Sequence, residues 1–435
     1  MSRIFKLGVG RERITPKIGT NLYGYPYDRF ATGVHDDLNA TAFAINNGED
    51  TFIIFSLDIC SLHIQEIKIV RGLINKKLGV KENNIFFSAI HTHSGPCTHG
   101  SSGWGQADTS YLDEILFPRL IVAAESALSS MKDAVMGIGS TESEVGINRR
   151  QITLEGNVLL GQNPWGLFNK EMTVFSFKEP DGAPIGIIVN YGCHGTSAGA
   201  GLEITRDWSG VMVDMLEKEY GCPCALLVGA LGDTGPRLPS GKTVGEIHYM
   251  EELGTVAGID AIRAYRTIKE YRVPDFKIKS LDITLPYEPL PDYEEVKEAL
   301  AALGNFDELK AVKLKVGLKY KRIIDIYEGR ATKEDGFRFK ATAFCLGDVA
   351  FIGFPFEVFG AICMRIALHS PFKKTLTLSN FNGSNGYFPS KGEILLGGYE
   401  VDMFKAFNGL SIDNDADTIA VQRAVEELSK LKAEI

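Results

Sequence analysis

The stretch Asn83–Pro96 reads NNIFFSAIHTHSGP, and the interpretation of the whole chain starts from it. Residues Ile85–Ile90 are an apolar run rich in β-formers, which predicts one buried strand. The run leads directly into His91 and His93, and the Ser-Gly-Pro that follows predicts a turn. Residues two apart on a strand point to the same side, so both imidazoles are expected to leave the strand end together.

This histidine pair has two interpretations. Imidazole is the commonest protein ligand for zinc, and its charge changes near neutral pH, so the pair favours a metal site or a catalytic site. The alternative is a pair of polar residues that cap a strand and hydrogen-bond to nearby backbone.

The length and pattern of the chain predict an α/β fold. With 435 residues, two or three domains or one large α/β unit are possible. Strand-like and helix-like segments alternate throughout, with no repeats and no low-complexity linker, which favours one large domain over residues 1–435. We expect mixed central β-sheets flanked by helices, with the metal site at strand ends. Residues 287–335 are charged and rich in Ala, Leu and Lys, and they predict a helical insertion.

Composition excludes several classes of function. The net charge is −9 and no basic cluster with interleaved aromatics occurs, which argues against nucleic-acid binding. No run of about 20 apolar residues predicts a membrane span, and the N-terminus lacks a signal-peptide pattern, so we expect a cytoplasmic protein. The 7 cysteines are scattered and odd in number, which predicts no disulfide framework. No GxGxxG or P-loop motif supports a nucleotide cofactor. Homo-oligomer formation stays open.

Further polar residues occur at the ends of other predicted strands. His194 follows the strand Ile185–Tyr191, Asp233 follows Ala225–Ala230, and Glu357 follows Val349–Phe354 at the start of a predicted helix that runs to His369. Sites in α/β folds form at the carboxyl ends of strands, and two histidines with one carboxylate are a recurring set for catalytic zinc. Each residue also has a structural alternative: His194 as a satisfied core histidine, and Glu357 as a first-turn carboxylate favoured by the helix dipole.

The sequence resembles the catalytic N-terminal domain of the neutral (non-lysosomal) ceramidase family. The resemblance runs from Gly8 to about Asp402, and HTHSGP at 91–96 is its most specific motif. The other landmarks, in the family's order, are ITP at 14–16, GVHDDL at 33–38, the strand ending in Asp58, INRR at 147–150, NYGCHG at 190–195, GALGD at 229–233, GFPFE at 353–357 and NGYFPS…GGYE at 385–400.

The resemblance implies a Zn²⁺ ion and a set of residues around it. The implied ligands are His91, His194, Glu357 and Tyr387. His93, Arg149 and Tyr399 match the positions that polarise the scissile carbonyl, hold the developing oxyanion and carry a proton to the leaving nitrogen. From the residues alone, an arginine such as Arg149 is usually a surface or salt-bridge residue.

Three departures from the family bear on the substrate. Gly235 stands where ceramidases carry an active-site serine. The C-terminal immunoglobulin-like domain of ceramidases is not expected in this chain, and neither is the signal of their largely secreted or surface-bound members. We therefore expect a zinc-dependent hydrolase of an amide bond in a small soluble substrate rather than in ceramide. A lactam, lactone or ester hydrolase is the close alternative, and a non-catalytic zinc-containing ligand-binding protein is the alternative from another class.

Overall fold

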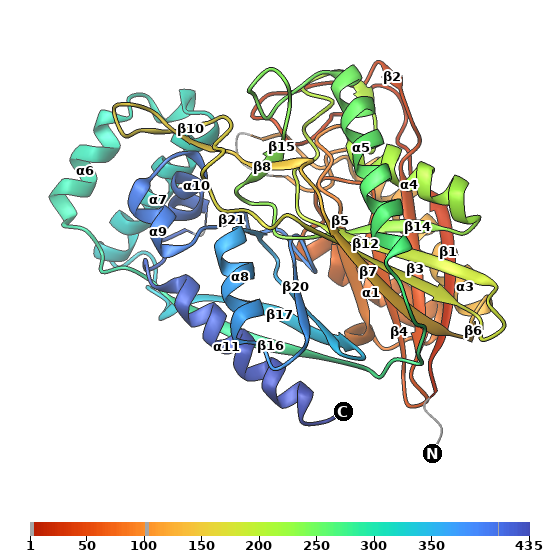
Figure 1. Cartoon of the computed structure of the whole chain (residues 1–435). Helices are drawn as coiled ribbons and strands as arrows, with labels where there is room; N and C mark the ends of the chain where they lie inside the picture. The colour runs from red at the N-terminus through yellow and green to blue at the C-terminus, as the bar shows by residue number, and fades with distance from the viewer. Residues whose placement is uncertain (1–3, 101–103, 408) are drawn as a thin grey trace.

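The computed structural model describes residues 4–100, 104–407 and 409–435. Its chain forms three main β-sheets, each with helices on its outer side (Figure 1). The first sheet has the strand order β5-β4-β3-β1-β6. Its strands are β1 (Lys6–Arg13), β3 (Asn39–Asn46), β4 (Thr51–Leu57), β5 (Ile85–Ala89) and β6 (Lys132–Asp133). The predicted hairpin around Asn47 and Gly48 is confirmed as the antiparallel pair β3–β4.

Helices α1 (Ile64–Leu78) and α3 (Phe117–Ser129) accompany the first sheet. Helix α3 packs closely on β1 because β1 has glycines at the contact. A Cβ at Gly8 or Gly10 would lie 2.1 or 2.2 Å from a backbone oxygen of α3, so any side chain there would push the helix away. Ahead of α3 come the short helix α2 (Thr109–Tyr111) and a π-helical turn (Leu112–Leu116), and a 3₁₀ turn (Glu82–Asn84) precedes β5.

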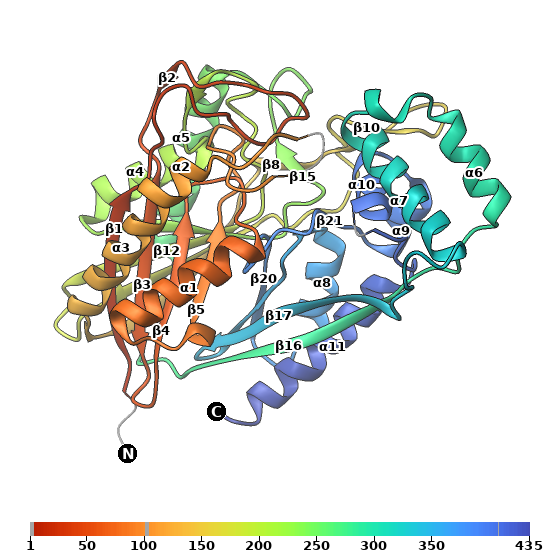
Figure 2. The same cartoon turned by 180° about the vertical axis from the view of Figure 1, so that it is seen from behind.

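The second sheet has the order β14-β12-β11-β7, and the third has the order β16-β17-β18-β20. The second comprises β7 (Val135–Glu142), β11 (Glu171–Lys178), β12 (Pro184–Tyr191) and β14 (Cys224–Val228), with helices α4 (Trp208–Tyr220) and α5 (Ile247–Arg266). The third comprises β16 (Phe276–Pro286), β17 (Gly336–Leu346), β18 (Val349–Gly353) and β20 (Lys374–Leu378), with helices α8 (Gly360–His369) and α11 (Ala416–Lys432). Figure 2 shows α11 running along β16 and β17.

Each sheet contains one parallel strand pair joined by a helical crossover. The pairs are β4–β5 through α1, β12–β14 through α4, and β18–β20 through α8. The remaining main pairings are antiparallel, which confirms the predicted mixed sheets. The three sheets share one apolar core, in which Phe43, Phe175 and Phe344 come from different sheets. This common core brings the carboxyl ends of the parallel strands toward one region.

Short two-stranded pairings and helices complete the molecule. The pairings join β2 (Gly33–Val34) with β13 (Glu203–Ile204), β8 (Gly146–Asn148) with β15 (Thr234–Pro236), β9 (Arg150–Ile152) with β10 (Val158–Leu160), and β19 (Glu357–Val358) with β21 (Tyr387–Phe388). The region predicted to be helical contains α6 (Tyr293–Ala302), a 3₁₀ turn (Phe306–Glu308) and α7 (Ala311–Tyr327). Helices α6 and α7 lie on the same side of the molecule as α9 (Lys391–Leu396) and α10 (Tyr399–Phe407) (Figures 1 and 2).

Three further predictions can be compared with the structure. The cysteines are all buried free thiols, so the absence of a disulfide framework is confirmed. None of the helices in the described part of the chain has the length and apolar character needed to cross a bilayer. The prediction that Glu357 opens a helix is wrong: Glu357 lies in β19, and the helix α8 begins only at Gly360.

Candidate active site

Three of the four predicted metal ligands meet at the carboxyl ends of the parallel strands. The Nε2 atoms of His91 and His194 lie 3.3 and 3.1 Å from the Oε2 atom of Glu357. Each of the three comes from a different sheet region, following β5, β12 and β18 respectively. All three side chains are buried, and together they form a group with the donor types and spacing of a metal site.

His91 and His93 lie close together, but they are not part of the strand as the sequence predicts. Strand β5 ends at Ala89, and His91 adopts a left-handed conformation with a φ of +70°. This conformation is uncommon for a non-glycine residue and is held by neighbours. Thr92 pairs with Gly195, and the His93 amide donates to the Gly195 carbonyl over 2.9 Å. The Nε2 atoms of His91 and His93 consequently lie 3.3 Å apart.

The Nδ1 atoms of two histidines are already engaged by backbone carbonyls. His91 Nδ1 lies 2.9 Å from the Cys60 carbonyl, and the side-chain amide of Asn380 is 3.0 Å from the same nitrogen. His194 Nδ1 lies 2.8 and 3.0 Å from the carbonyls of Leu231 and Thr234. A carbonyl accepts only from a protonated nitrogen, so in the neutral form of each ring the lone pair is on Nε2, which faces the site. This is the arrangement that orients histidine ligands toward a metal.

A second group of possible ligands, Cys60 with His91 and His93, fits a metal less well. The Cys60 sulfur lies 3.5 Å from His91 Nδ1, on the side of the ring away from Glu357. Ligation from that side would require the nitrogen that donates to the Cys60 carbonyl. The group of His91, His194 and Glu357 is therefore the better candidate.

The electrostatics of the group suit a cation. Burial lowers the pKa of His194 to about 3, with a further contribution from Arg149, so its imidazole is neutral. Burial would raise the pKa of Glu357, but the two histidines outweigh it and hold that pKa well below its usual range. Burial opposes the charged form of His91, yet Cys60 and Glu357 raise its pKa well above the ordinary value. A divalent ion bound here would displace that proton, as metal binding to histidine generally does.

Tyr387, the fourth predicted ligand, is placed beside Glu357 by strand pairing. Strands β19 and β21 are parallel, and Glu357 is directly opposite Tyr387 in their register. Burial raises the pKa of the Tyr387 phenol well above its usual value, with Glu357 adding to the effect. Arg149 Nη2 donates to the phenol oxygen over 3.0 Å. A phenolate at this position thus needs the cation and the guanidinium to stabilise it.

Arg149 is held by a buried carboxylate that sequence reasoning missed. Glu400 accepts from Arg149 Nε over 2.9 Å and from Arg150 Nη1 over 2.7 Å. The side chains of Arg149, Arg150 and Glu400 are 7%, 1% and 1% exposed. The motifs INRR and GGYE contain these residues, but no signal in the sequence pairs them. The salt-bridge interpretation of Arg149 is therefore confirmed, whereas a surface position is not, because both partners are buried.

The two remaining predicted site residues lie at the edge of the same group. The ring of Tyr399, the first residue of α10, has its centroid 5.7 Å from that of Tyr387. His93 Nδ1 is buried and has no hydrogen-bond partner among the residues that the structure describes. Gly24 lies against this ring, and a Cβ there would come within 2.5 Å of it. All seven predicted site residues are therefore brought together around one point.

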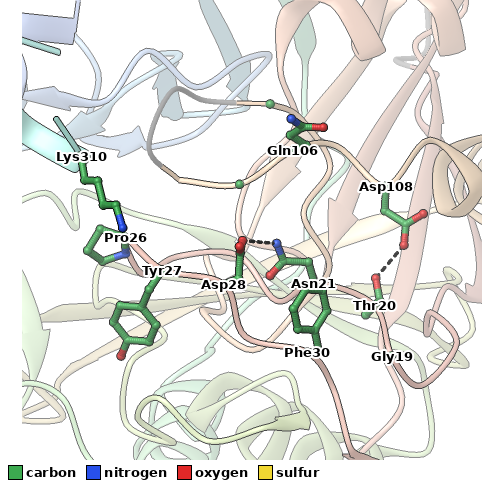
Figure 3. A pocket seen from close by; sticks show the side chains of 12 residues that line it. Gly19, Thr20, Asn21, Pro26, Tyr27, Asp28, Phe30, Gln106, Asp108 and Lys310 are labelled. Carbon is green, nitrogen blue, oxygen red and sulfur yellow. Dashed lines mark hydrogen bonds between the residues drawn. The ribbon is translucent and has the colours of Figure 1, made fainter. Parts of the chain in front are cut away.

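A small cavity borders this group, and the structure also has a larger basin. The cavity has a volume of about 50 Å³ and is lined by His91, His93, Glu357, Tyr387, Tyr399, Tyr23, Gly24, Cys60, Ser61, His99, Trp104, Ser384, Gly386 and Met403. The basin, about 1040 Å³, lies between the loop that carries Tyr27 and Asp28, the segment with Gln106 and Asp108, and Lys310 (Figure 3). The same two chain segments thus line both spaces.

The packing around Gly235 leaves no room for a larger side chain. Gly235 lies in β15 opposite Ile147 of β8. A Cβ at Gly235 would be 2.7 Å from Thr243 Cβ and 3.4 Å from Arg149 Cβ. The buried Thr243 therefore occupies the space that a side chain at position 235 would need.

Comparisons with known proteins identify relatives of this chain. The family described as neutral/alkaline non-lysosomal ceramidase, N-terminal, matches residues 5–226. Neutral ceramidase 2 of Arabidopsis thaliana is 27% identical over 210 residues, which cover 44% of this chain and 27% of that protein. Neutral ceramidase of Oryza sativa subsp. japonica is 24% identical over 234 residues, covering 47% and 29%. The matched part thus spans little more than a quarter of these relatives.

Solved structures share the fold over the whole chain. The crystal structure of neutral ceramidase from Pseudomonas aeruginosa superposes with a TM-score of 0.75 at 20% identity, covering 99% of this chain and 75% of that one. A ceramidase complexed with C2 gives the same TM-score at 18% identity, covering 100% and 76%. The predicted α/β fold is confirmed by this likeness, and the family match over residues 5–226 shows that the chain belongs to the neutral/alkaline non-lysosomal ceramidase family.

Proposed function

We propose that this protein is a zinc-dependent hydrolase that cleaves an amide bond of a small soluble substrate. The observation that carries the proposal is the convergence of His91 Nε2, His194 Nε2 and Glu357 Oε2, with both Nδ1 atoms held by backbone carbonyls. Tyr387, opposite Glu357 in the strand register, is the proposed fourth ligand. When bound, zinc supplies a Lewis acid and lowers the pKa of water toward 7.

The neighbouring side chains have the chemistry that amide hydrolysis requires. Arg149 and Tyr399 are hydrogen-bond donors beside the proposed ligands, and we assign them to the oxygen that becomes negative when the carbonyl is attacked. Burial and the nearby histidines lower the pKa of His93 well below its usual value, so its ring is neutral. We assign His93 to proton transfer toward the leaving nitrogen.

Two features support a substrate smaller than ceramide. The cavity at the ligand group, about 50 Å³, has room for only a few atoms. At position 235, where the resemblance to ceramidases places a serine, this chain has a glycine, and Thr243 fills the space beside it.

Two coarser assignments accompany this proposal. We propose one catalytic domain over the chain, with residues 287–335 as a helical insertion beside α9 and α10. We also propose a cytoplasmic location, because seven buried free thiols suit a reducing compartment.

Metal analysis combined with a hydrolysis screen tests the function. Protein purified without chelator is expected to carry about one zinc per chain and to hydrolyse small acyl amides, with activity lost on chelation and restored by zinc. Lactams, lactones and esters belong in the same screen, since the site would also attack an ester carbonyl. Faster hydrolysis of esters or lactones than of amides would show that the natural substrate contains an ester or lactone bond. Absence of stoichiometric zinc would overturn the metal proposal, and zinc without any turnover would favour a ligand-binding protein.

A further inference from the structure

The cavity beside the proposed ligands contains two polar groups whose hydrogen-bonding capacity is unused. Ser61 is 2% exposed, and its Oγ atom has no hydrogen-bond partner among the described residues. The Nε1 atom of Trp104 is likewise buried, and no acceptor for it is found within the described ranges. Both residues line the cavity. A buried polar group without a partner costs roughly 1–3 kcal/mol, so a bound molecule that supplies one is favoured.

These groups offer hydrogen-bond donors to the cavity. The indole nitrogen of Trp104 can only donate, and the Ser61 hydroxyl can donate once its proton is free to rotate. The lining contains a single carboxylate, Glu357, which is committed to the ligand group. The wall formed by Ser61 and Trp104 therefore suits an acceptor on the bound molecule.

A lysine lies close to His99, another residue of the cavity lining. Val312 of α7 packs in the same cluster as Trp104 and Tyr399, and Lys315 follows one turn later on the same helix face. His99, a further lining residue, has its pKa lowered to about 4 by burial and by the charges of His63 and Lys315. His99 is thus a neutral hydrogen-bonding group close to a lysine, a setting in which an anion is stabilised.

The chain also indicates which part of a substrate lies here. The segment that places Gly24 against the His93 ring places Tyr23 against His99, with 3.4 Å between the Tyr23 hydroxyl and His99 Nε2. His93 is the residue assigned to the leaving nitrogen. The donor wall is therefore on the amine side of the scissile bond.

We propose that Ser61, Trp104 and His99 form a subsite for a carboxylate on the amine portion of the substrate, so that the substrates are small N-acylamino acids. This inference rests on the proposed hydrolase function. In the reaction, the C–N bond breaks, a water oxygen bonds to the acyl carbon, and a proton passes to the nitrogen. The products are a carboxylate from the acyl group and a free amino acid.

A matched pair of compounds tests the subsite. N-acetylglycine and N-acetylisobutylamine have similar shapes, but only the first has carboxylate oxygens. We expect kcat/KM to favour N-acetylglycine by roughly 10²-fold or more, because a site built to hydrogen-bond a substrate group rejects the analogue that lacks it. Ser61→Ala and Trp104→Phe should each reduce this ratio by about tenfold. The control is Trp165→Phe, because Trp165 is 93% exposed, and it should leave the ratio unchanged.

The outcomes separate the subsite from the proposed function. If both compounds are hydrolysed equally well, or if the variants leave the ratio unchanged, the subsite is wrong while the hydrolase stands. If neither is hydrolysed, the same pair is titrated against tryptophan fluorescence. Saturable quenching by N-acetylglycine alone, weakened in Ser61→Ala and absent in Trp104→Phe, would support the subsite although the hydrolase proposal had failed for these amides. No binding of either compound would overturn the subsite.

Discussion

Replacing Glu400 with glutamine tests how the buried arginine pair is held. Its two carboxylate oxygens accept separately from Arg149 and Arg150, over 2.9 and 2.7 Å. Glutamine keeps the shape but removes the charge, and its amide nitrogen must face one of the two guanidinium groups. At least one charge-assisted hydrogen bond is therefore lost, and a buried cation is left without its counter-charge.

The expected loss of stability follows from the burial of all three side chains. Breaking a buried ion pair by removing one partner costs about 3–5 kcal/mol. The entropy of unfolding is about 2.1 cal/mol/K per residue, which for 435 residues amounts to roughly 0.9 kcal/mol/K. Glu400→Gln should therefore lower Tm by about 3–5 °C. Because Arg149 contacts Tyr387, kcat should also fall, by roughly 10²-fold if the guanidinium shifts by about 1 Å.

Glu393→Gln is the matched control. Glu393 accepts from Arg150 Nε over 2.6 Å, but its side chain is 29% exposed. Ion pairs reached by solvent contribute about 0–1 kcal/mol, so Tm should change by no more than about 1 °C. Differential scanning calorimetry and kcat on a confirmed substrate measure both variants. Equal, small Tm changes in the two variants would refute the argument that burial makes the Glu400 pair strong.

Three further predictions concern other parts of the structure. His91→Ala should lose zinc and activity together, whereas His93→Ala should keep zinc and slow kcat by roughly 10²–10⁴-fold; equal metal loss in both would make His93 a ligand. Gly235→Ser should lower the free energy of unfolding by about 1–3 kcal/mol through overpacking, because its Cβ would lie 2.7 Å from that of Thr243. Adding Thr243→Ala should recover most of this loss in a urea titration, and no recovery would show that the strain lies elsewhere. Burial raises the pKa of Asp58 to about 6 from an ordinary 3.8, so the wild-type protein loses stability as pH rises between these values. The stability of Asp58→Asn relative to the wild type should therefore increase by about 1–2 kcal/mol from pH 5 to pH 8, and a difference that stays constant with pH in thermal melts would contradict this pKa.

Much of the architecture is readable from the sequence because it depends on local patterns. Three apolar runs, which precede His91, His194 and Glu357, predict buried strands. The structure has a strand at each of these places, and a site residue follows each strand. That strand ends carry sites in α/β folds is a general rule, so grouping these residues needs no knowledge of the register.

The features that the sequence does not reveal depend on contacts between distant segments. The left-handed φ of His91 depends on packing against Gly195, and nothing in HTHSGP indicates it. Glu357 was expected in a helix because Phe356 and the apolar run after it suit one, but pairing with β21 holds it in a strand. Glu400 becomes recognisable as the partner of Arg149 only once the fold places α10 within hydrogen-bond reach of Arg149 and Arg150.

The parallel pairing of β19 with β21 has a consequence for the order of biosynthesis. The two histidines of the proposed metal site belong to the N-terminal half of the chain, whereas Glu357 and Tyr387 belong to the C-terminal part. Domains begin to fold from the N-terminus as they are synthesised, so a nascent chain can form the first two sheets before either oxygen ligand has left the ribosome. The complete ligand set, and with it any hydrolytic activity, arises only after Tyr387 has been synthesised, and a product truncated before Glu357 would hold two histidines without the groups that complete the site.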